Sequence, residues 1–220
     1  MRRLWAFLAL TRPKFLPLSI VPVVLAASMA VRDSENINYG RLFLCLFGVV
    51  LLHAASNAAN DCYDYVLGAD KVQTTGRYSG GSGVLPRGLV TVREAKMLFA
   101  ELFVVSLVIA LWLSLGVSHY PFVLGLFGAL AGLCYTMHPV KLAYRGLGEL
   151  TVALSFGPGI MMGSFYVLRG YHSAEVLGLS ALVGALVGSV LVINEMKDAI
   201  TDLAAGKHTL AVRLKLRTLR

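Results

Sequence analysis

Charged residues are scarce in this chain of 220 residues. They make up 15% of the sequence, whereas hydrophobic residues make up 57%. A soluble globular domain carries about 25% charged residues, so the composition excludes that class. Acidic residues are the scarcest, with 12 Asp and Glu against 20 Lys and Arg.

Cysteine is also rare, and the spacing of the cysteines shows no pairing pattern. The three cysteines, Cys45, Cys62 and Cys134, stand alone with no Cys-x-x-Cys spacing. This excludes a disulfide framework and a cysteine-based zinc site. The sequence also has no Walker A motif and no convincing full-length repeat.

What the chain has instead is long uncharged runs. They cover residues 15–31, 42–60, 102–140, 150–168 and 176–194. A membrane-spanning helix needs about 20 apolar residues, so the run 102–140 is long enough for two spans, and we place the break near His119-Tyr-Pro121. Because backbone groups in a bilayer must bond to each other, we predict an all-α bundle of six spans forming one domain over residues 1–220.

The placement of basic residues predicts the orientation. With the N-terminus in the cytoplasm, all Lys and Arg except Arg32, Arg41 and Arg169 fall in cytoplasmic segments. This asymmetry is the positive-inside pattern of integral membrane proteins. We therefore attribute the net charge of +8 to topology in an inner or plasma membrane, and expect no nucleic-acid binding.

Half of the acidic residues gather in two places. The first follows the run 42–60, where Asn57, Asn60, Asp61 and Asp64 share one helix face, with Asp70 shortly after. Each acid would cost roughly 2.5–3.5 kcal/mol at the bilayer centre. Such a cluster of oxygen ligands predicts a bound cation, the alternative being a polar helix end in contact with water.

The second cluster follows the last uncharged run. Asn194, Asp198 and Asp202 are spaced four residues apart beside Glu195, close to one helix face. The predicted topology brings both clusters to the cytoplasmic side. Scattered solvating acids would not be distributed in this way.

The predicted cytoplasmic loops add basic and aromatic residues, and the sequence allows more than one role for them. Ser79-Gly-Gly-Ser-Gly83 is typical of a flexible linker or of a phosphate-binding loop. Tyr135 and Tyr144 are typical of an interfacial aromatic belt or of a site. His53, one turn before Asn57, is more typical of an interhelical hydrogen bond than of a ligand.

These features together predict a particular substrate. Magnesium held by Asp and Asn would bridge the oxygens of a diphosphate, with Lys and Arg stabilising it as it leaves. The apolar bundle would hold an isoprenoid tail and shield the resulting allylic carbocation from water. An electron-rich acceptor would then capture the carbocation.

The chain resembles the UbiA superfamily of membrane prenyltransferases. Asn60-x-x-x-Asp64 and Asn194-x-x-x-Asp198-x-x-x-Asp202 match its two Asp-rich motifs. It is most similar to the branch that prenylates 1,4-dihydroxy-2-naphthoate in menaquinone synthesis. That similarity is carried by Arg12-Pro-Lys14, Asn57–Asp64, Gly68-Ala-Asp70, Tyr144–Glu149 and Ala205–Arg213.

The resemblance implies Mg²⁺ as cofactor and a polyprenyl diphosphate and an aromatic acceptor as partners in the bilayer. It implies metal ligands at Asn60, Asp61, Asp64, Asp70, Asn194, Asp198 and Asp202. Asp64, Asp198 and Lys207 are the expected catalytic residues. The expected diphosphate contacts are Lys71, Arg77, Arg87, Lys141, Arg145 and Lys207, and the expected acceptor-pocket residues are Asn57, Tyr135 and His138.

Two departures from the family pattern stand out. Position 68 is glycine where the commoner motif has a third Asp, although the naphthoate branch similarly has Gly there and an Asp two residues later. The family fold has nine helices and this chain supplies six, so a missing C-terminal part or a second chain would complete the bundle. Open alternatives are another acceptor (4-hydroxybenzoate, homogentisate, chlorophyllide or a glyceryl-phosphate lipid), a divalent-cation transporter, or an inactive truncated remnant.

Overall fold

A computed structural model describes residues 2–69 and 81–218. The described part of the chain is helical and contains no strand. The helices are α1 (Arg2–Leu10), α2 (Pro17–Asp33), α3 (Tyr39–Leu67), α4 (Val92–Leu115), α5 (Tyr120–Thr136), α6 (Gly148–Leu154), α7 (Gly163–Arg169), α8 (Ala174–Ala204) and α9 (Leu210–Thr218). Short 3₁₀ turns occupy Pro13–Phe15 and Ala143–Arg145, and a π-helical segment, Ser155–Met162, joins α6 to α7.

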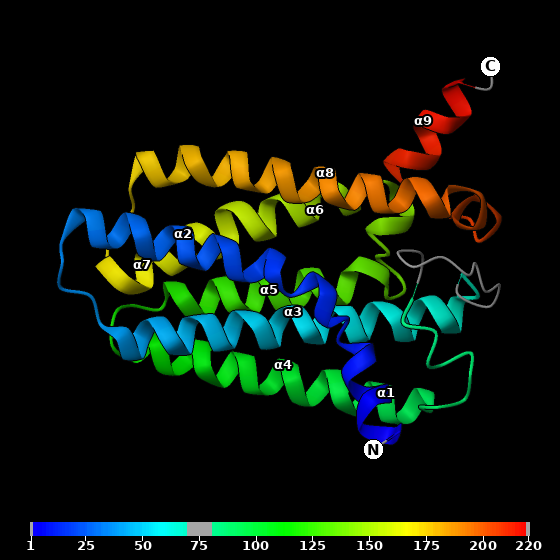
Figure 1. Ribbon diagram of the computed structural model, residues 1–220, viewed down its shortest axis with the longest axis horizontal. Helices are drawn as coiled ribbons and strands as arrows, with labels where there is room; N and C mark the ends of the chain where they lie inside the picture. Colours follow the sequence, from blue (N-terminus) through cyan, green and yellow to red (C-terminus); the bar gives the residue numbers. More distant parts are fainter. Residues whose placement is uncertain (1, 70–80, 219–220) are drawn as a thin grey trace.

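The helices form one elongated bundle (Figure 1). We call the end where α3 and α8 reach their C-termini the mouth end, and the opposite end the far end. Both predicted acidic clusters therefore lie at the mouth end. The connections α2–α3, α4–α5 and α7–α8 lie at the far end.

The membrane-spanning helices agree with the uncharged runs. Four are long and apolar enough to cross a membrane, namely α3, α4, the continuous helix Gly148–Arg169 and the stretch Ala174–Ile200 of α8. The pair Arg3–Phe15 and Pro17–Asp33, bent by 52°, gives a fifth if it is counted as one span, and α5 is a shorter apolar helix. The described residues thus contain four to five candidate spans, where the sequence predicted six. The predicted break near His119-Tyr-Pro121 is confirmed, because α4 ends at Leu115 and α5 begins at Tyr120.

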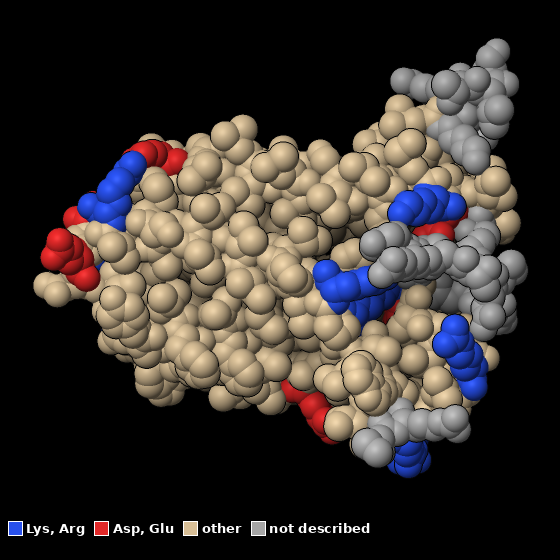
Figure 2. Space-filling model, viewed as in Figure 1, with Lys and Arg blue, Asp and Glu red and all other residues tan. Residues whose placement is uncertain are grey.

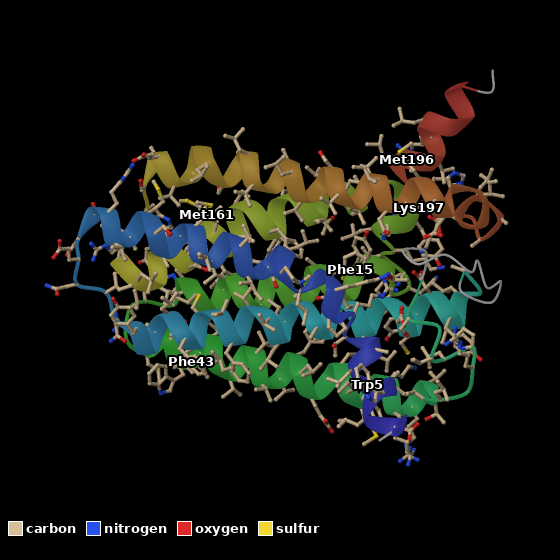
Figure 3. All side chains as sticks on the ribbon, in the orientation of Figure 1. Trp5, Phe15, Phe43, Met161, Met196 and Lys197 are labelled. Carbon is tan, nitrogen blue, oxygen red and sulfur yellow. The ribbon has the colours of Figure 1, made fainter. Side chains whose placement is uncertain are left out.

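The sides of the bundle are apolar and the ends are charged. Figure 2 shows Lys, Arg, Asp and Glu gathered mainly toward the two ends, with a largely uncharged band between them. Large apolar side chains lie exposed on this band, such as Phe43 of α3, which points outward in Figure 3. In a soluble protein a continuous apolar surface of this extent would aggregate, so the band is the surface that faces lipid.

Local sequence signals explain where the helices at the mouth end begin and end. Thr91 and Glu94 form a reciprocal capping box at the start of α4. Gly68 ends α3 in the left-handed region, with φ 93°. A glycine adopts that conformation without the strain that a side chain would bring.

Glycines also allow two helices to touch directly. A Cβ added at Gly157, in the π-helical segment, would lie 2.3 Å from the carbonyl oxygen of Ser180 on α8. One added at Gly184 would lie 2.3 Å from the carbonyl oxygen of Ala153. The stretch Gly157-Pro-Gly159 lies within the π-helical segment, which contains Pro158 and packs against α8.

Candidate functional site

A lysine joins the two acidic clusters at the mouth end. Nζ of Lys207 lies 2.8 Å from Oδ2 of Asp64 on α3 and 3.7 Å from Oδ1 of Asp202 on α8. All three residues are buried. The ammonium group therefore occupies the space between the carboxylates of two helices that are distant in sequence.

The end of α8 places Lys207 there. Gly206 adopts a left-handed conformation, with φ 75°, and its N–H bonds to the carbonyl of Leu203. The N–H of Lys207 then donates to the carbonyl of Asp202 at 2.8 Å. This glycine turn folds the chain back, so that the lysine side chain returns over the acid that precedes it.

Asp64 is the centre of the hydrogen-bond network. Besides the lysine, its carboxylate accepts a hydrogen bond from Oη of Tyr144 at 3.0 Å and one from Nδ2 of Asn60 at 3.2 Å. Nδ2 of Asn60 also donates to Oγ1 of Thr136 at 2.6 Å. Charge-assisted bonds of this kind fix the carboxylate in place.

Tyr144 belongs to this network. The sequence alone left open whether this tyrosine lies in an interfacial aromatic belt or in a site. Its ring lies 5.1 Å from Nζ of Lys207 and 5.1 Å from Nζ of Lys141. Its backbone carbonyl accepts from the N–H of His208 at 3.1 Å. The tyrosine thus ties the loop before α6 to the segment after α8.

Burial changes the acidity of Asp202. The pKa of this carboxyl is raised to about 6, first by loss of solvent and then by the negative charges of Asp64 and Asp198. The Lys207 ammonium acts in the opposite direction. Acids crowded together in this way favour the approach of a positive charge.

Asp61, one turn before Asp64, has different partners. Its carboxylate accepts from Nε of Arg12 at 3.0 Å and from Nη2 of the same guanidinium. It also accepts from the backbone N–H of Ser82 at 2.9 Å and from the Ser82 hydroxyl. Asp61 therefore binds the α1–α2 turn and the loop before α4.

An apolar cavity of about 270 Å³ lies below the mouth, inside the bundle. Arg12, Asn57, Asn60, Tyr135 and Asn194 line it, together with apolar side chains from α2 to α8. Its lining on α3 runs from Leu44 to Asn60, a length of about 24 Å at 1.5 Å per residue. Its far end is formed by a buried cluster of Cys45, Leu113 and Val167.

The other expected residues are distributed as follows. Asn57, Asn60, Tyr135 and Asn194 line the cavity, and Asp198 lies within electrostatic range of Asp202. His138, Arg87 and Arg145 are exposed in the loops, and Arg145 donates to the carbonyl of Pro139. Asp70, Lys71 and Arg77 lie outside the described residues. His53 forms the expected interhelical contact, with Nδ1 3.1 Å from Oγ of Ser19.

The described part of the chain holds no preassembled metal cluster. Within it, no group of three or more His, Cys, Asp or Glu side chains is close enough together to bind an ion. Magnesium usually uses one or two carboxylates and takes its remaining ligands from water and substrate phosphates. The oxygen donors of Asn60, Asp64, Asn194, Asp198 and Asp202 fit that chemistry.

Fold and site together define an integral membrane protein with a buried, charged cluster at one end of the bundle and an apolar cavity inside it. The chain belongs to the UbiA prenyltransferase family, whose model matches residues 19–220. This agrees with the resemblance seen in the two Asp-rich motifs.

Individual relatives make the placement more specific. The chain is 32% identical to a 1,4-dihydroxy-2-naphthoate octaprenyltransferase of Escherichia coli, over 96% of this chain and 69% of that protein. It is 28% identical to the Haemophilus influenzae protein of the same name, over 92% of this chain and 67% of that protein. A UbiA prenyltransferase domain-containing protein 1 of Dictyostelium discoideum is 27% identical, over 96% and 64%. The chain spans about two thirds of the length of these curated relatives.

Solved structures share the fold. A UbiA homolog from Archaeoglobus fulgidus, bound to DMAPP and Mg²⁺, superposes with a TM-score of 0.69 at 18% identity, over 94% of this chain and 69% of that one. A digeranylgeranylglyceryl phosphate synthase has the same TM-score at 21% identity, over 97% of this chain and 70% of that one. At these identities the likeness concerns the fold.

Proposed function

We propose that this protein transfers a polyprenyl group from an allylic polyprenyl diphosphate to an aromatic acceptor, 1,4-dihydroxy-2-naphthoate. The observation that carries the proposal is the placement of Lys207 between Asp64 and Asp202. Asp64 accepts a hydrogen bond from Asn60, which lines the apolar cavity. A diphosphate head and an isoprenoid tail match these two environments. The names of the curated relatives support the choice of acceptor.

Several side chains would act on the diphosphate. Asn60, Asp64, Asn194, Asp198 and Asp202 would hold Mg²⁺, and Asp61 and Asp70 stand close to them in sequence. Magnesium, when bound, supplies Lewis-acid stabilisation of negative charge on the phosphate oxygens. Lys207 would stabilise the leaving diphosphate with its ammonium group, and Lys141 would add positive charge across the Tyr144 ring.

The cavity would control the fate of the allylic group. Its lining is mainly apolar, and with substrate bound these walls would limit the access of water, so that the cationic carbon would meet the aromatic acceptor before it is hydrolysed. Asn57 and Tyr135 line the cavity and would contact the acceptor ring. The products would be the prenylated ring, diphosphate and, from a carboxylated acceptor, carbon dioxide.

A divalent-cation transporter is less well supported. Transporters usually bind their ions near the membrane midplane on broken helices. Here the acids lie at one end of the bundle, and the π-helical break Ser155–Met162 lines the apolar cavity.

The test is an acceptor panel. Membranes containing the full chain are incubated with Mg²⁺, an allylic diphosphate and the acceptors 1,4-dihydroxy-2-naphthoate, 4-hydroxybenzoate and homogentisate, and products are identified by mass spectrometry. We expect the decarboxylated prenyl naphthoquinol, lost on chelation with EDTA. Product from another ring alone would contradict the acceptor assignment, and Mg²⁺ uptake into proteoliposomes without turnover would contradict the enzyme assignment.

A further inference from the structure

His53 is a polar residue in the middle of the apolar cavity. The cavity lining on α3 runs from Leu44 to Asn60, and His53 lies about 10 Å from Asn60 toward the far end, at 1.5 Å per residue. Apolar side chains such as Leu52 and Phe156 line the cavity around it. The sequence predicts an interhelical hydrogen bond for this histidine, which leaves its role toward the cavity open.

Two contacts fix the imidazole ring. Nδ1 lies 3.1 Å from Oγ of Ser19 on α2. The ring of Phe156 packs edge-on against the imidazole, with centroids 4.9 Å apart and an angle of 87° between the planes. The imidazole is therefore held in one orientation by neighbours from two other helical segments.

The hydroxyl of Ser19 determines which ring nitrogen carries the proton. Its single hydrogen is donated to the backbone carbonyl of Leu16, at 2.8 Å. Toward His53 the Ser19 oxygen can then only accept, so Nδ1–H is the donor. No ion pair among the described residues involves His53, and a lone charge in an apolar space is costly. The imidazole is therefore neutral, and Nε2 carries a lone pair.

This lone pair is available to a ligand. Among the described residues no group donates to Nε2, and Nε2 is not one of the buried polar atoms that lack a partner. It therefore keeps accessible surface, and since His53 lines the cavity, that surface faces the cavity. A ligand with an O–H group would satisfy Nε2, whereas an isoprenoid chain would leave it unsatisfied.

We infer that Nε2 of His53 accepts a hydrogen bond from a ring hydroxyl of the aromatic acceptor, and that Ser19 is a positioning residue that holds the required tautomer. The inference rests on the proposed function and places the acceptor ring within the cavity. His53 thus selects acceptors by their hydroxyl groups.

The chemistry of the acceptor indicates which hydroxyl is bound. In 1,4-dihydroxy-2-naphthoate the reacting carbon carries the carboxylate, so it has to lie beside the allylic carbon, near the acids of the mouth end. The 1-hydroxyl is next to this carboxylate and can bond to it. The 4-hydroxyl points away from the mouth end, toward the depth at which His53 lies.

The experiment measures binding of two ligands without turnover. Purified protein in detergent is titrated, under anaerobic conditions and with Mg²⁺ and pyrophosphate present, with 1,4-dihydroxy-2-naphthoate and with 1-hydroxy-2-naphthoate, which lacks the 4-hydroxyl. The variants are His53→Phe, His53→Gln and Ser19→Ala. The control is His119→Phe, the same change at an exposed position of the far end.

Wild type should bind the dihydroxy ligand about 3- to 10-fold more tightly than the monohydroxy ligand, the range of one hydrogen bond between uncharged groups. His53→Phe should remove this preference by weakening only the dihydroxy ligand. His53→Gln, which keeps an acceptor oxygen, should retain part of the preference, and Ser19→Ala should lower it. His119→Phe should keep the wild-type ratio.

The ratio of the two affinities separates this inference from the proposed function. A wild-type ratio in His53→Phe, or equal weakening of both ligands, would overturn the role of His53 while the acceptor assignment stands. If the wild type binds neither naphthoate, the acceptor assignment fails and the inference fails with it.

The tautomer is tested separately by NMR of protein labelled with ¹⁵N in its histidines. The signals of His53 are those that change in Ser19→Ala, so the measurement decides even if the His53 variants do not fold. We expect a proton on Nδ1 and none on Nε2, and a shift of the Nε2 signal with the dihydroxy ligand but not with the monohydroxy ligand. A proton on Nε2 in the ligand-free protein would overturn the inference.

Discussion

The ammonium group of Lys207 donates a hydrogen bond to the carboxylate of Asp64 at 2.8 Å, although 143 positions separate the two residues in the sequence. Both side chains are buried. A buried cation between acids from α3 and α8 neutralises charges that would otherwise repel, and it holds the two helix ends together.

Replacing Lys207 by Met should therefore weaken both stability and function. Removing one partner of a buried pair costs about 3–5 kcal/mol, because the other charge stays buried and uncompensated. We expect a lower melting temperature in detergent and a loss of diphosphate release. Added Mg²⁺ should raise the melting temperature of Lys207→Met more than that of wild type, because the ion can neutralise the acids that Lys207 no longer compensates.

Neutralising Asp64 tests the centre of the network. Asp64→Asn removes a charge that accepts from Lys207, Tyr144 and Asn60, and should abolish Mg²⁺-dependent release of diphosphate. The matched control is Asp33→Asn, which removes an acid paired with Arg169 at the far end. Equal loss of activity in both variants would show that charge anywhere in the chain matters, and would contradict a specific role of Asp64.

The glycine contact between the π-helical segment and α8 gives a prediction on stability. Gly157→Ala would bring a methyl group against backbone atoms of Ser180 and Gly184, which cannot rotate away. Overpacking of this kind costs about 1–3 kcal/mol. Gly178 lies on α8, and a methyl group added there meets nothing within 4 Å. Alanine also stabilises a helix relative to glycine, by up to about 1 kcal/mol.

The measurement is thermal unfolding of both glycine variants in the same detergent. Gly157→Ala should melt below wild type and Gly178→Ala at or above it. A pair of equal melting temperatures would show that the close backbone approach does not hold in the folded protein.

Hydropathy and charge were sufficient to predict the fold class. Uncharged runs of span length follow from the absence of water in the bilayer, so the spans 42–60 and 176–194 reappear within α3 and α8. Helix-breaking residues marked the division of the run 102–140. How the helices surround a cavity depends on side-chain packing between distant segments, which hydropathy does not encode.

The sequence predicted that the two acidic clusters lie at the same end of the bundle, as they do, but it did not predict which side chains pair there. Spacing placed Asp61 and Asp64 on one helix face, yet residues three apart differ by about 60° around the axis. That angle is enough for Asp61 to contact Arg12 and for Asp64 to contact Lys207. Tyr144 and Arg12 could not be selected, because their neighbours are set by loops whose course the sequence does not specify.

The far end of the cavity predicts an effect on substrate length. Leu113 of α4 is 5% exposed and closes the cavity together with Cys45 and Val167. Leu113→Ala should deepen the cavity and cost about 2–5 kcal/mol in stability, as large-to-small changes in a core do. If the isoprenoid tail lies in the cavity, this variant should raise the rate with a longer allylic diphosphate relative to a shorter one.

Leu115 provides the control, because it lies two residues further along the same helix and is 82% exposed. Leu115→Ala makes the same chemical change on the outer surface, where substitutions stay within about 0.5 kcal/mol, and should leave the ratio of the two rates at the wild-type value. The ratio is measured by mass spectrometry with paired diphosphates that differ by one isoprene unit. Because a ratio cancels any loss of folded protein, an unchanged value for Leu113→Ala would exclude contact between the tail and this end of the cavity.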